Sequence, residues 1–98
     1  MSQPVIAQDE LNDHLAHLPG WTLEGKTIVS KYEFKDFVTA LQFVNLVGTS
    51  AEAINHHPDI DIRYNKVKLL LTTHDSGGIT KNDIELAVAA DGFAEAFN

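Results

Sequence analysis

Residues 50–74 read SAEAINHHPDIDIRYNKVKLLLTTH, and this stretch decides the fold because it joins the end of a helix to a β-hairpin. Its first part continues a helical pattern, and Pro58 marks the point where that pattern stops. Proline disfavours the helical conformation of the residue before it, so His57 is pushed toward an extended conformation. We therefore expect the helix to end near Asn55 or His56, which leaves two adjacent histidines at a junction.

The second part of the stretch predicts two antiparallel strands. Apolar and polar residues alternate on both sides of Asn65–Lys66, which can form a tight turn. Because a hairpin with strands of similar length returns the chain near its starting point, we expect His74 to lie close to His56 and His57. The residues that share a face are Ile60, Ile62 and Tyr64 before the turn and Val67, Leu69, Leu71 and Thr73 after it.

Three further elements are predicted upstream of this stretch. A short helix is expected over residues 8–18, and a hairpin is expected over residues 21–34, where apolar residues alternate around Gly25–Lys26. A long amphipathic helix is expected over residues 36–55, because apolar residues recur there at steps of three and four. The predicted stripe consists of Phe37, Ala40, Leu41, Val44, Val47, Ala51 and Ile54.

Downstream, residues 74–78 read HDSGG and predict a loop. Thr80, followed three residues later by Asp83, resembles a capping box and predicts the start of a last helix. The order α-β-β-α-β-β-α predicts an α+β fold with two layers, a four-stranded antiparallel sheet with three helices on one face. Such a small sheet has exposed edges, and strand addition across a two-fold axis predicts a homo-oligomer.

Composition limits the classes of function. A chain of 98 residues supports one hydrophobic core, so we expect a single domain over residues 1–98. The net charge of −7 argues against direct nucleic-acid binding, and the lack of cysteine excludes thiol chemistry and Cys-based metal sites. No apolar run reaches membrane-spanning length, and no basic segment with a following apolar run opens the chain, so we expect a cytoplasmic protein without a membrane partner.

His56, His57 and His74 are the candidate catalytic residues. All three lie at the ends of predicted elements, and histidine donates and accepts protons near neutral pH, so the cluster suggests general acid and base catalysis. The bland alternative is that loop histidines only cap or face solvent, which is how we interpret His14 and His17 on the first helix. A metal site is the other alternative, but adjacent histidines in an extended segment point to opposite faces, and we predict no metal.

Two carboxylates could join the cluster. Glu52 lies four residues before His56, a spacing that puts two side chains on one helical face, so it could bind or orient; it could equally be surface charge. Asp83 is fully explained as part of a helix cap, yet the start of the last helix follows the His74 loop closely. Both interpretations of Asp83 stay open.

The residues EAINHHP at 52–58, YNKV at 64–67, LTTH at 71–74 and Asp83-Ile84 together resemble the pterin-4a-carbinolamine dehydratases. The resemblance extends outside this signature to Pro19-Gly20-Trp21, to FKDF at 34–37 and to the last helix, so it covers nearly the whole chain. A pattern with several separated parts is much more specific than a single pair of histidines, although relatives of the fold can have other roles.

This resemblance implies dehydration of 4a-hydroxytetrahydrobiopterin, the product of aromatic amino acid hydroxylation, to quinonoid dihydropterin and water, without metal or organic cofactor. It implies acid and base roles for His56 and His74, and a role for His57 in binding the pterin and supporting catalysis. The other residues expected to contact the substrate are Glu52, Asn55, Pro58, Thr72, Thr73, Asp75 and Asp83.

A second function belongs to a different class. The family includes members that also act as dimerisation cofactors of transcription factors, so the chain could be a protein-interaction module with a protein partner. The resemblance does not settle whether the oligomer is a homodimer or a homotetramer. The complete histidine set favours the enzyme, since a pure scaffold has no need of clustered proton donors.

Overall fold

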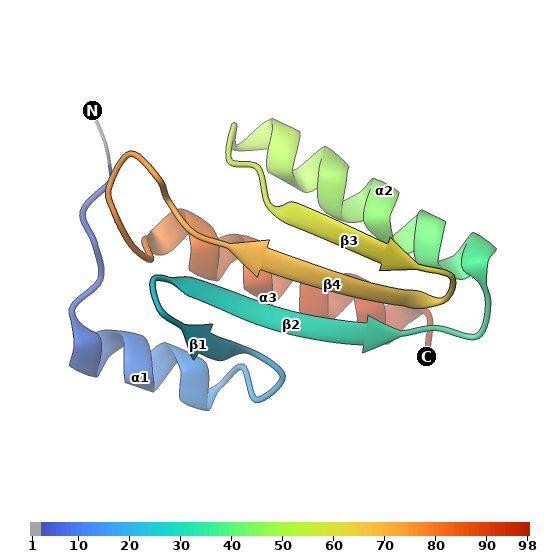
Figure 1. Cartoon of the computed structure of the whole chain (residues 1–98), viewed down its shortest axis with the longest axis horizontal. Coiled ribbons are helices and arrows are strands. Elements are labelled where there is room, and N and C mark those ends of the chain that lie inside the picture. The colour runs from blue at the N-terminus through green and yellow to red at the C-terminus, as the bar shows by residue number, and fades with distance from the viewer. Residues whose placement is uncertain (1–2) are drawn as a thin grey trace.

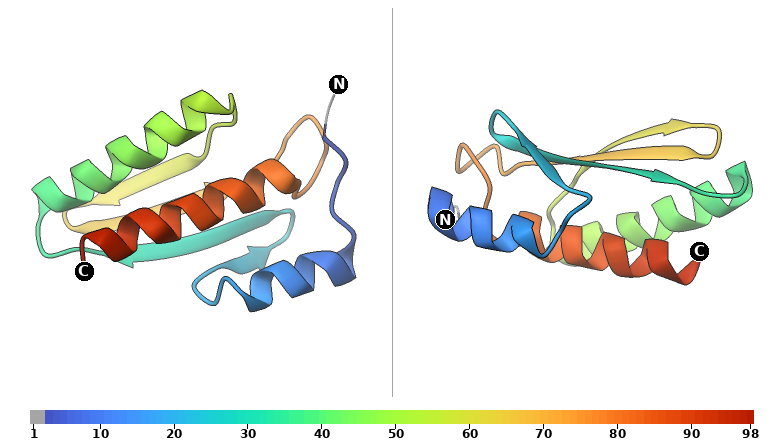
Figure 2. Two further views of the ribbon diagram at one scale, coloured as in Figure 1. Left: turned by 180° about the vertical axis from the view of Figure 1, so that it is seen from behind. Right: turned by 90° about the horizontal axis from the view of Figure 1, so that it is seen from below.

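Four antiparallel strands form one sheet, and three helices lie on one of its faces (Figures 1 and 2). The computed structural model describes residues 3–98, and the predicted α+β fold and element order are confirmed. The elements are α1 (Gln8–Ala16), β1 (Thr22–Glu24), β2 (Thr27–Glu33), α2 (Phe37–Ala53), β3 (Asp59–Arg63), β4 (Lys66–Leu71) and α3 (Lys81–Ala96). No helix in this described part is long and apolar enough to cross a membrane.

The strand order is β1-β2-β4-β3, so β1 and β3 are the two edges of the sheet. In the β3–β4 pair, Asp59 lies opposite Leu70 and Arg63 lies opposite Lys66. This register puts the residues that precede β3 and the residues that follow β4 at the same end of the sheet. The two separated parts of the predicted site, 56–58 and 72–74, are therefore brought to one end by the second hairpin.

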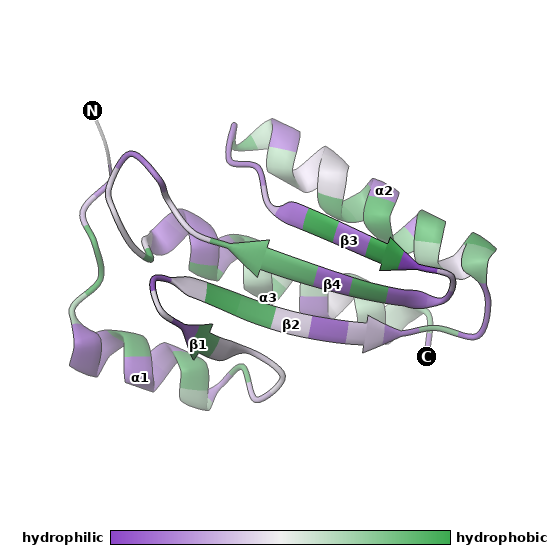
Figure 3. Cartoon of the chain, viewed as in Figure 1, coloured by the Kyte–Doolittle hydropathy of each residue, from purple (hydrophilic) through white to green (hydrophobic). Residues whose placement is uncertain are grey.

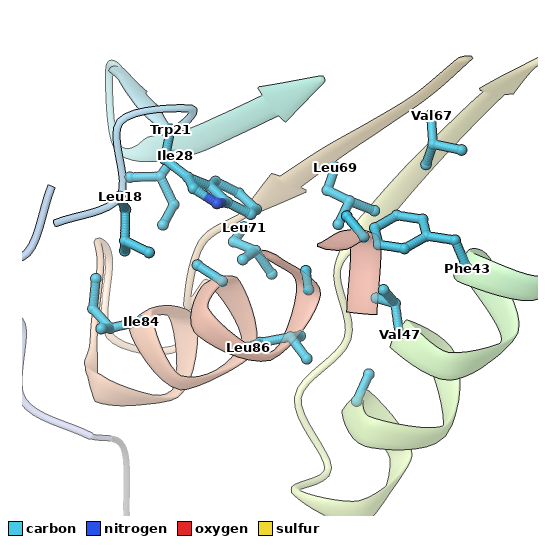
Figure 4. Packing of buried hydrophobic residues seen from close by; sticks show 14 of the residues in the cluster. Leu18, Trp21, Ile28, Phe43, Val47, Val67, Leu69, Leu71, Ile84 and Leu86 are labelled. Atoms are coloured by element: carbon cyan, nitrogen blue, oxygen red, sulfur yellow. The ribbon is translucent and has the colours of Figure 1, made fainter. Parts of the chain in front are cut away.

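The core lies between the sheet and the helices, with Phe43 and Val47 of α2 facing Val67 and Leu69 of β4 (Figure 4). Alternation along the strands produces this arrangement, and in Figure 3 hydrophilic and hydrophobic residues alternate along β3. The other large, fully buried side chains include Ile28, Leu71 and Leu86.

The apolar stripe predicted for α2 is partly wrong. Phe37, Leu41 and Ile54 are exposed, while Phe43, which was not in the predicted stripe, is fully buried. The buried face of α2 follows Ala40, Phe43, Val47 and Ala51 at steps of three and four. Because α2 is apolar over more than one face, two neighbouring stripes fit helical spacing, and packing against the sheet selects one of them.

A part-buried polar cluster between α3 and the sheet was not predicted from the sequence. Asp91 of α3 accepts hydrogen bonds from Trp21 Nε1 at 3.1 Å and from the Tyr32 hydroxyl at 2.5 Å. Burial, followed by the hydrogen bond to Asp91, raises the pKa of Tyr32 well above its usual range, so the hydroxyl stays protonated and donates. These bonds tie α3 to the segment before β1 and to β2.

Candidate active site

The end of α2 determines where His56 lies. After the C-cap residue Ile54, Asn55 has a φ of 51°, a left-handed conformation that asparagine tolerates better than most residues. The Asn55 N–H donates to the Glu52 carbonyl at 3.2 Å, and the His56 N–H donates to the Ala51 carbonyl at 3.0 Å. These two bonds form a Schellman motif, which ends the helix and turns His56 back beneath its last turn.

His56 is held by a buried carboxylate. Its Nε2 lies 2.5 Å from Asp83 Oδ1, and the side chains are 10% and 0% exposed, respectively. Asp83 comes from the first turn of α3, 27 positions later in the chain. When the carboxylate is ionised it can only accept hydrogen bonds, so Nε2 is then the donor of this bond, and a neutral ring has its lone pair on Nδ1.

The other oxygen of Asp83 joins the cap of α3 to the end of β4. Oδ2 accepts from the Thr80 N–H at 2.9 Å and from the Thr73 hydroxyl at 2.7 Å. The hydroxyls of Thr73 and Thr80 lie 2.8 Å apart, and Thr80 and Asp83 form the capping box predicted from the sequence. Asp83 therefore fulfils both of its alternative interpretations at once: it caps α3 and it binds His56.

Thr80 was predicted only as a helix cap. The structure makes it part of the hydrogen-bonded group around Asp83, although its side chain is fully buried and does not reach solvent. The same capping-box spacing that predicted the helix start was the only sequence signal for this contact. Nothing local to Thr80 indicates that its partner carboxylate also holds a histidine.

His57 forms the second histidine–carboxylate pair, on the surface. Its Nε2 lies 2.5 Å from Glu52 Oε2, and the side chains are 58% and 76% exposed. Helical spacing had aligned Glu52 with His56, but α2 ends at Ala53, and the turn at Asn55 brings His57 to Glu52 instead. Glu52 does reach the histidine segment, and its partner is the neighbouring ring.

His74 lies in a tight turn that follows β4. The Gly77 N–H donates to the Thr73 carbonyl at 2.9 Å and the Thr73 N–H donates to the Gly78 carbonyl at 3.0 Å, which closes the loop on itself. The His74 side chain is exposed, and within residues 3–98 it has no hydrogen bond or ion pair. The backbone of this turn sets the place of His74, directly after Thr73.

The remaining predicted residues surround this end of the sheet. Asn55 is exposed, and its backbone forms the turn that positions His56. The Thr72 hydroxyl donates to the carbonyl of Lys26, in the turn between β1 and β2, at 2.6 Å. Pro58 is half-buried and Asp75 is exposed. The structure thus joins His56, Asp83 and Thr73 directly, and joins His57 to Glu52 separately.

A hollow of about 470 Å³ lies elsewhere, among charged residues of β2, β3 and β4 such as Lys31, Asp61 and Lys68. None of the predicted site residues lines it, and we place the candidate site by its chemistry instead. In the part of the chain that the structure describes, no three histidine or acidic side chains are arranged to hold a metal ion. The site is a set of imidazoles, two of them oriented by carboxylates.

This arrangement can move protons. His56 and His57 each present Nε2 to a carboxylate and leave Nδ1 available, and His74 presents an unconstrained ring to solvent. A carboxylate that fixes the tautomer and direction of an imidazole prepares it to accept a proton, while a solvated imidazole can donate one. The geometry fits a reaction that needs one proton removed and one delivered.

The comparisons with known proteins identify the family. The sequence profile of the pterin 4 alpha carbinolamine dehydratase family matches residues 4–93, and the chain belongs to this family of hydro-lyases. The match includes every residue of the candidate site.

Individual relatives agree with that assignment. A protein of Chloroflexus aurantiacus named "Putative pterin-4-alpha-carbinolamine dehydratase" is 49% identical over 90% of this chain and 95% of its own. One of Koribacter versatilis with the same name is 52% identical over 84% of this chain and 87% of its own. A crystal structure from Brucella melitensis, described as a transcriptional coactivator/pterin dehydratase, has a TM-score of 0.88 and 35% identity, covering 92% of this chain and 98% of that one.

Proposed function

We propose that this chain dehydrates 4a-hydroxytetrahydrobiopterin to quinonoid dihydropterin and water by acid and base catalysis with His56 and His74. The observation that carries the proposal is the 2.5 Å bond between the nearly buried His56 and the fully buried Asp83. Thr73, the residue directly before His74, donates a hydrogen bond to that same carboxylate. The family assignment supports the substrate class.

The reaction requires two proton transfers. The C4a hydroxyl leaves as water after it receives a proton, and the neighbouring ring nitrogen loses its proton as the new C=N double bond forms. His56, with Nε2 held by Asp83 and Nδ1 free, is suited to accept the proton from the ring nitrogen. His74, exposed and without a side-chain partner in the described chain, is suited to deliver a proton to the hydroxyl.

We assign binding of the pterin ring to the exposed pair of His57 and Glu52. A pterin ring carries several hydrogen-bond donors and acceptors, and an imidazole with a fixed tautomer beside a carboxylate can bind both kinds. The residues that we assign to binding around the ring are Asn55, Pro58, Thr72 and Asp75. Asp83 holds His56, and Thr73 connects Asp83 to the start of the His74 turn.

The test is the rate at which purified protein accelerates the loss of enzymatically generated 4a-hydroxytetrahydropterin, followed by ultraviolet absorbance with a chelator present. His56→Ala and His74→Ala should each lower kcat by about 100-fold or more, since general acid or base catalysis contributes that much. The matched control is His17→Ala, which changes an exposed histidine at the C-cap of α1 and should leave kcat unchanged.

Three other results would contradict parts of the proposal. Unchanged turnover in both site variants would remove the acid and base roles. Loss of activity with chelator would point to a metal. No acceleration by a folded protein would favour the interaction role that the description of the Brucella melitensis structure also names.

We also propose that the chain forms a homodimer or homotetramer. The edge strands β1 and β3 have unpaired backbone groups, and the exposed face of α2 carries the apolar residues Val38 and Leu41. The mass of one chain is 10.8 kDa, and sedimentation should give two or four times that mass. A mass equal to that of one chain would contradict this proposal.

A further inference from the structure

The segment of residues 3–6 lies against the loop that carries His74. In Figures 1 and 2 it runs beside the connection between β4 and α3. The Ser76 hydroxyl donates to the Gln3 carbonyl, and the Ile6 N–H donates to the Ile79 carbonyl at 2.8 Å. The Ile6 side chain is buried in the core, which anchors the segment at that end. We call residues 3–6 the strap.

Val5 and Gly78 show how closely the strap approaches the loop. A Cβ atom added to Gly78 would lie 3.1 Å from Val5 Cγ1 and 3.5 Å from Val5 Cγ2. The first of these distances is tighter than most Cβ contacts, so a side chain at Gly78 would require the exposed Val5 side chain to shift by a few tenths of an ångström. Gly78 has no left-handed φ, so the effect of a side chain at this position would come from its contact with Val5.

The strap matters because His74 differs from the other two histidines. Carboxylates orient His56 and His57, whereas His74 forms no ion pair with a carboxylate within residues 3–98. The position of His74 therefore depends on the backbone of its turn. One side of that turn is fixed by Thr73, which binds Asp83, and the other side is fixed by the strap at Ser76 and Ile79.

We propose that the strap positions His74, the proposed proton donor. Its positioning residues are Val5, Ser76 and Gly78. This inference rests on the proposed function for its consequence in catalysis. Movement of a catalytic group by about 1 Å can cost up to about 100-fold in rate, so a modest displacement of the strap should be measurable.

The experiment is a pair of substitutions that break and restore the contact. Gly78→Ala should push Val5 away and lower kcat about tenfold, with KM changed less than about twofold, because His57 and Glu52 are untouched. Adding Val5→Ala removes both methyl groups that the new Cβ would meet, so the double variant should recover most of kcat. Gly92→Ala on α3, where nothing lies within 4 Å of an added Cβ, is the control and should leave kcat unchanged.

A cycle with His74 separates positioning from general damage. In a His74→Ala background, Gly78→Ala should lower kcat no further, because the group that it misplaces is already absent. An equal loss in both backgrounds would overturn the proposal, and so would a double variant that stays as slow as Gly78→Ala alone.

A spectroscopic readout keeps the inference independent of the activity. The imidazole Hε1 resonance of His74 should shift in Gly78→Ala and return in the double variant, while the resonance of His56 stays in place. If the natural chain proves inactive, the proposed function fails, and this resonance still tests the strap. An unmoved His74 resonance in Gly78→Ala would overturn the inference.

Discussion

Asp36 and Asp83 both cap the first turn of a helix, and they do so in different surroundings. Asp36 Oδ1 accepts from the Thr39 N–H at 2.8 Å and from the Thr39 hydroxyl at 2.6 Å, at the start of α2. Asp83 Oδ2 accepts from the Thr80 N–H at 2.9 Å and from the Thr73 hydroxyl at 2.7 Å, at the start of α3. Each uses one carboxylate oxygen for the local structure of its helix.

The difference lies in the second oxygen. In Asp83 the second oxygen binds His56, and the carboxylate is fully buried, whereas in Asp36 every side-chain bond in the described structure goes to Thr39. The Asp36 cap therefore has a structural role alone, whereas the Asp83 cap also fixes His56, a candidate catalytic residue, relative to α3. Burial and the long-range partner His56, and not the capping motif, distinguish Asp83 from Asp36.

Replacing Asp83 with alanine should have the largest effect. The variant leaves the Thr80 N–H, the Thr73 hydroxyl and His56 Nε2 without their acceptor inside the protein, and removal of one partner from a buried pair costs about 3–5 kcal/mol. We expect the free energy of unfolding, measured with urea, to fall by about 3 kcal/mol or more. A loss below about 1 kcal/mol would show that water replaces the carboxylate, and the contrast with Asp36 would then be wrong.

Asp83→Asn sharpens the comparison by separating the two oxygens. Its carbonyl oxygen can still accept from the Thr80 N–H and the Thr73 hydroxyl, but its amide N–H₂ then faces His56 and requires the opposite tautomer. We expect kcat to fall about 100-fold or more, with a smaller loss of stability than in Asp83→Ala. Asp36→Asn is the matched control, since Asp36 binds no histidine, and its kcat should stay within about twofold of the natural chain.

Most of the fold follows from signals between residues close in sequence. The alternation on both sides of Asn65–Lys66 predicted β3 and β4, and the three-residue spacing of Thr80 and Asp83 predicted the start of α3. The buried face of α2 did not follow, because two apolar stripes on one helix satisfy the same spacing. Packing against the sheet decides between such stripes, and packing is a property of the whole fold.

The residues of the candidate site stay a prediction from the sequence, and the bonds between them did not follow from it. The hairpin argument placed His56 and His74 at one end of the sheet, and the register of β3 and β4 agrees. The bond between His56 and Asp83 joins residues 27 apart and depends on the left-handed turn at Asn55 and on the placement of α3. Helical spacing assigned Glu52 to His56 because it could not include that turn.

The smallest expected effect concerns Asp36 and pH. Hydrogen bonds from Thr39, first through its side chain and then through its backbone, hold the pKa of Asp36 below its usual value. A carboxyl whose pKa is lowered on folding stabilises the protein above its unfolded pKa, about 3.9, and this contribution is lost as pH falls through the lower folded pKa.

Asp36→Asn keeps a capping oxygen without the charge, so its Tm should lie slightly below that of the natural chain at pH 7, and the gap in Tm should close near pH 2. Thermal unfolding followed by circular dichroism measures both. A gap that persists in acid would mean that the charge of Asp36 contributes nothing, and its cap would then depend only on the geometry of the hydrogen bonds.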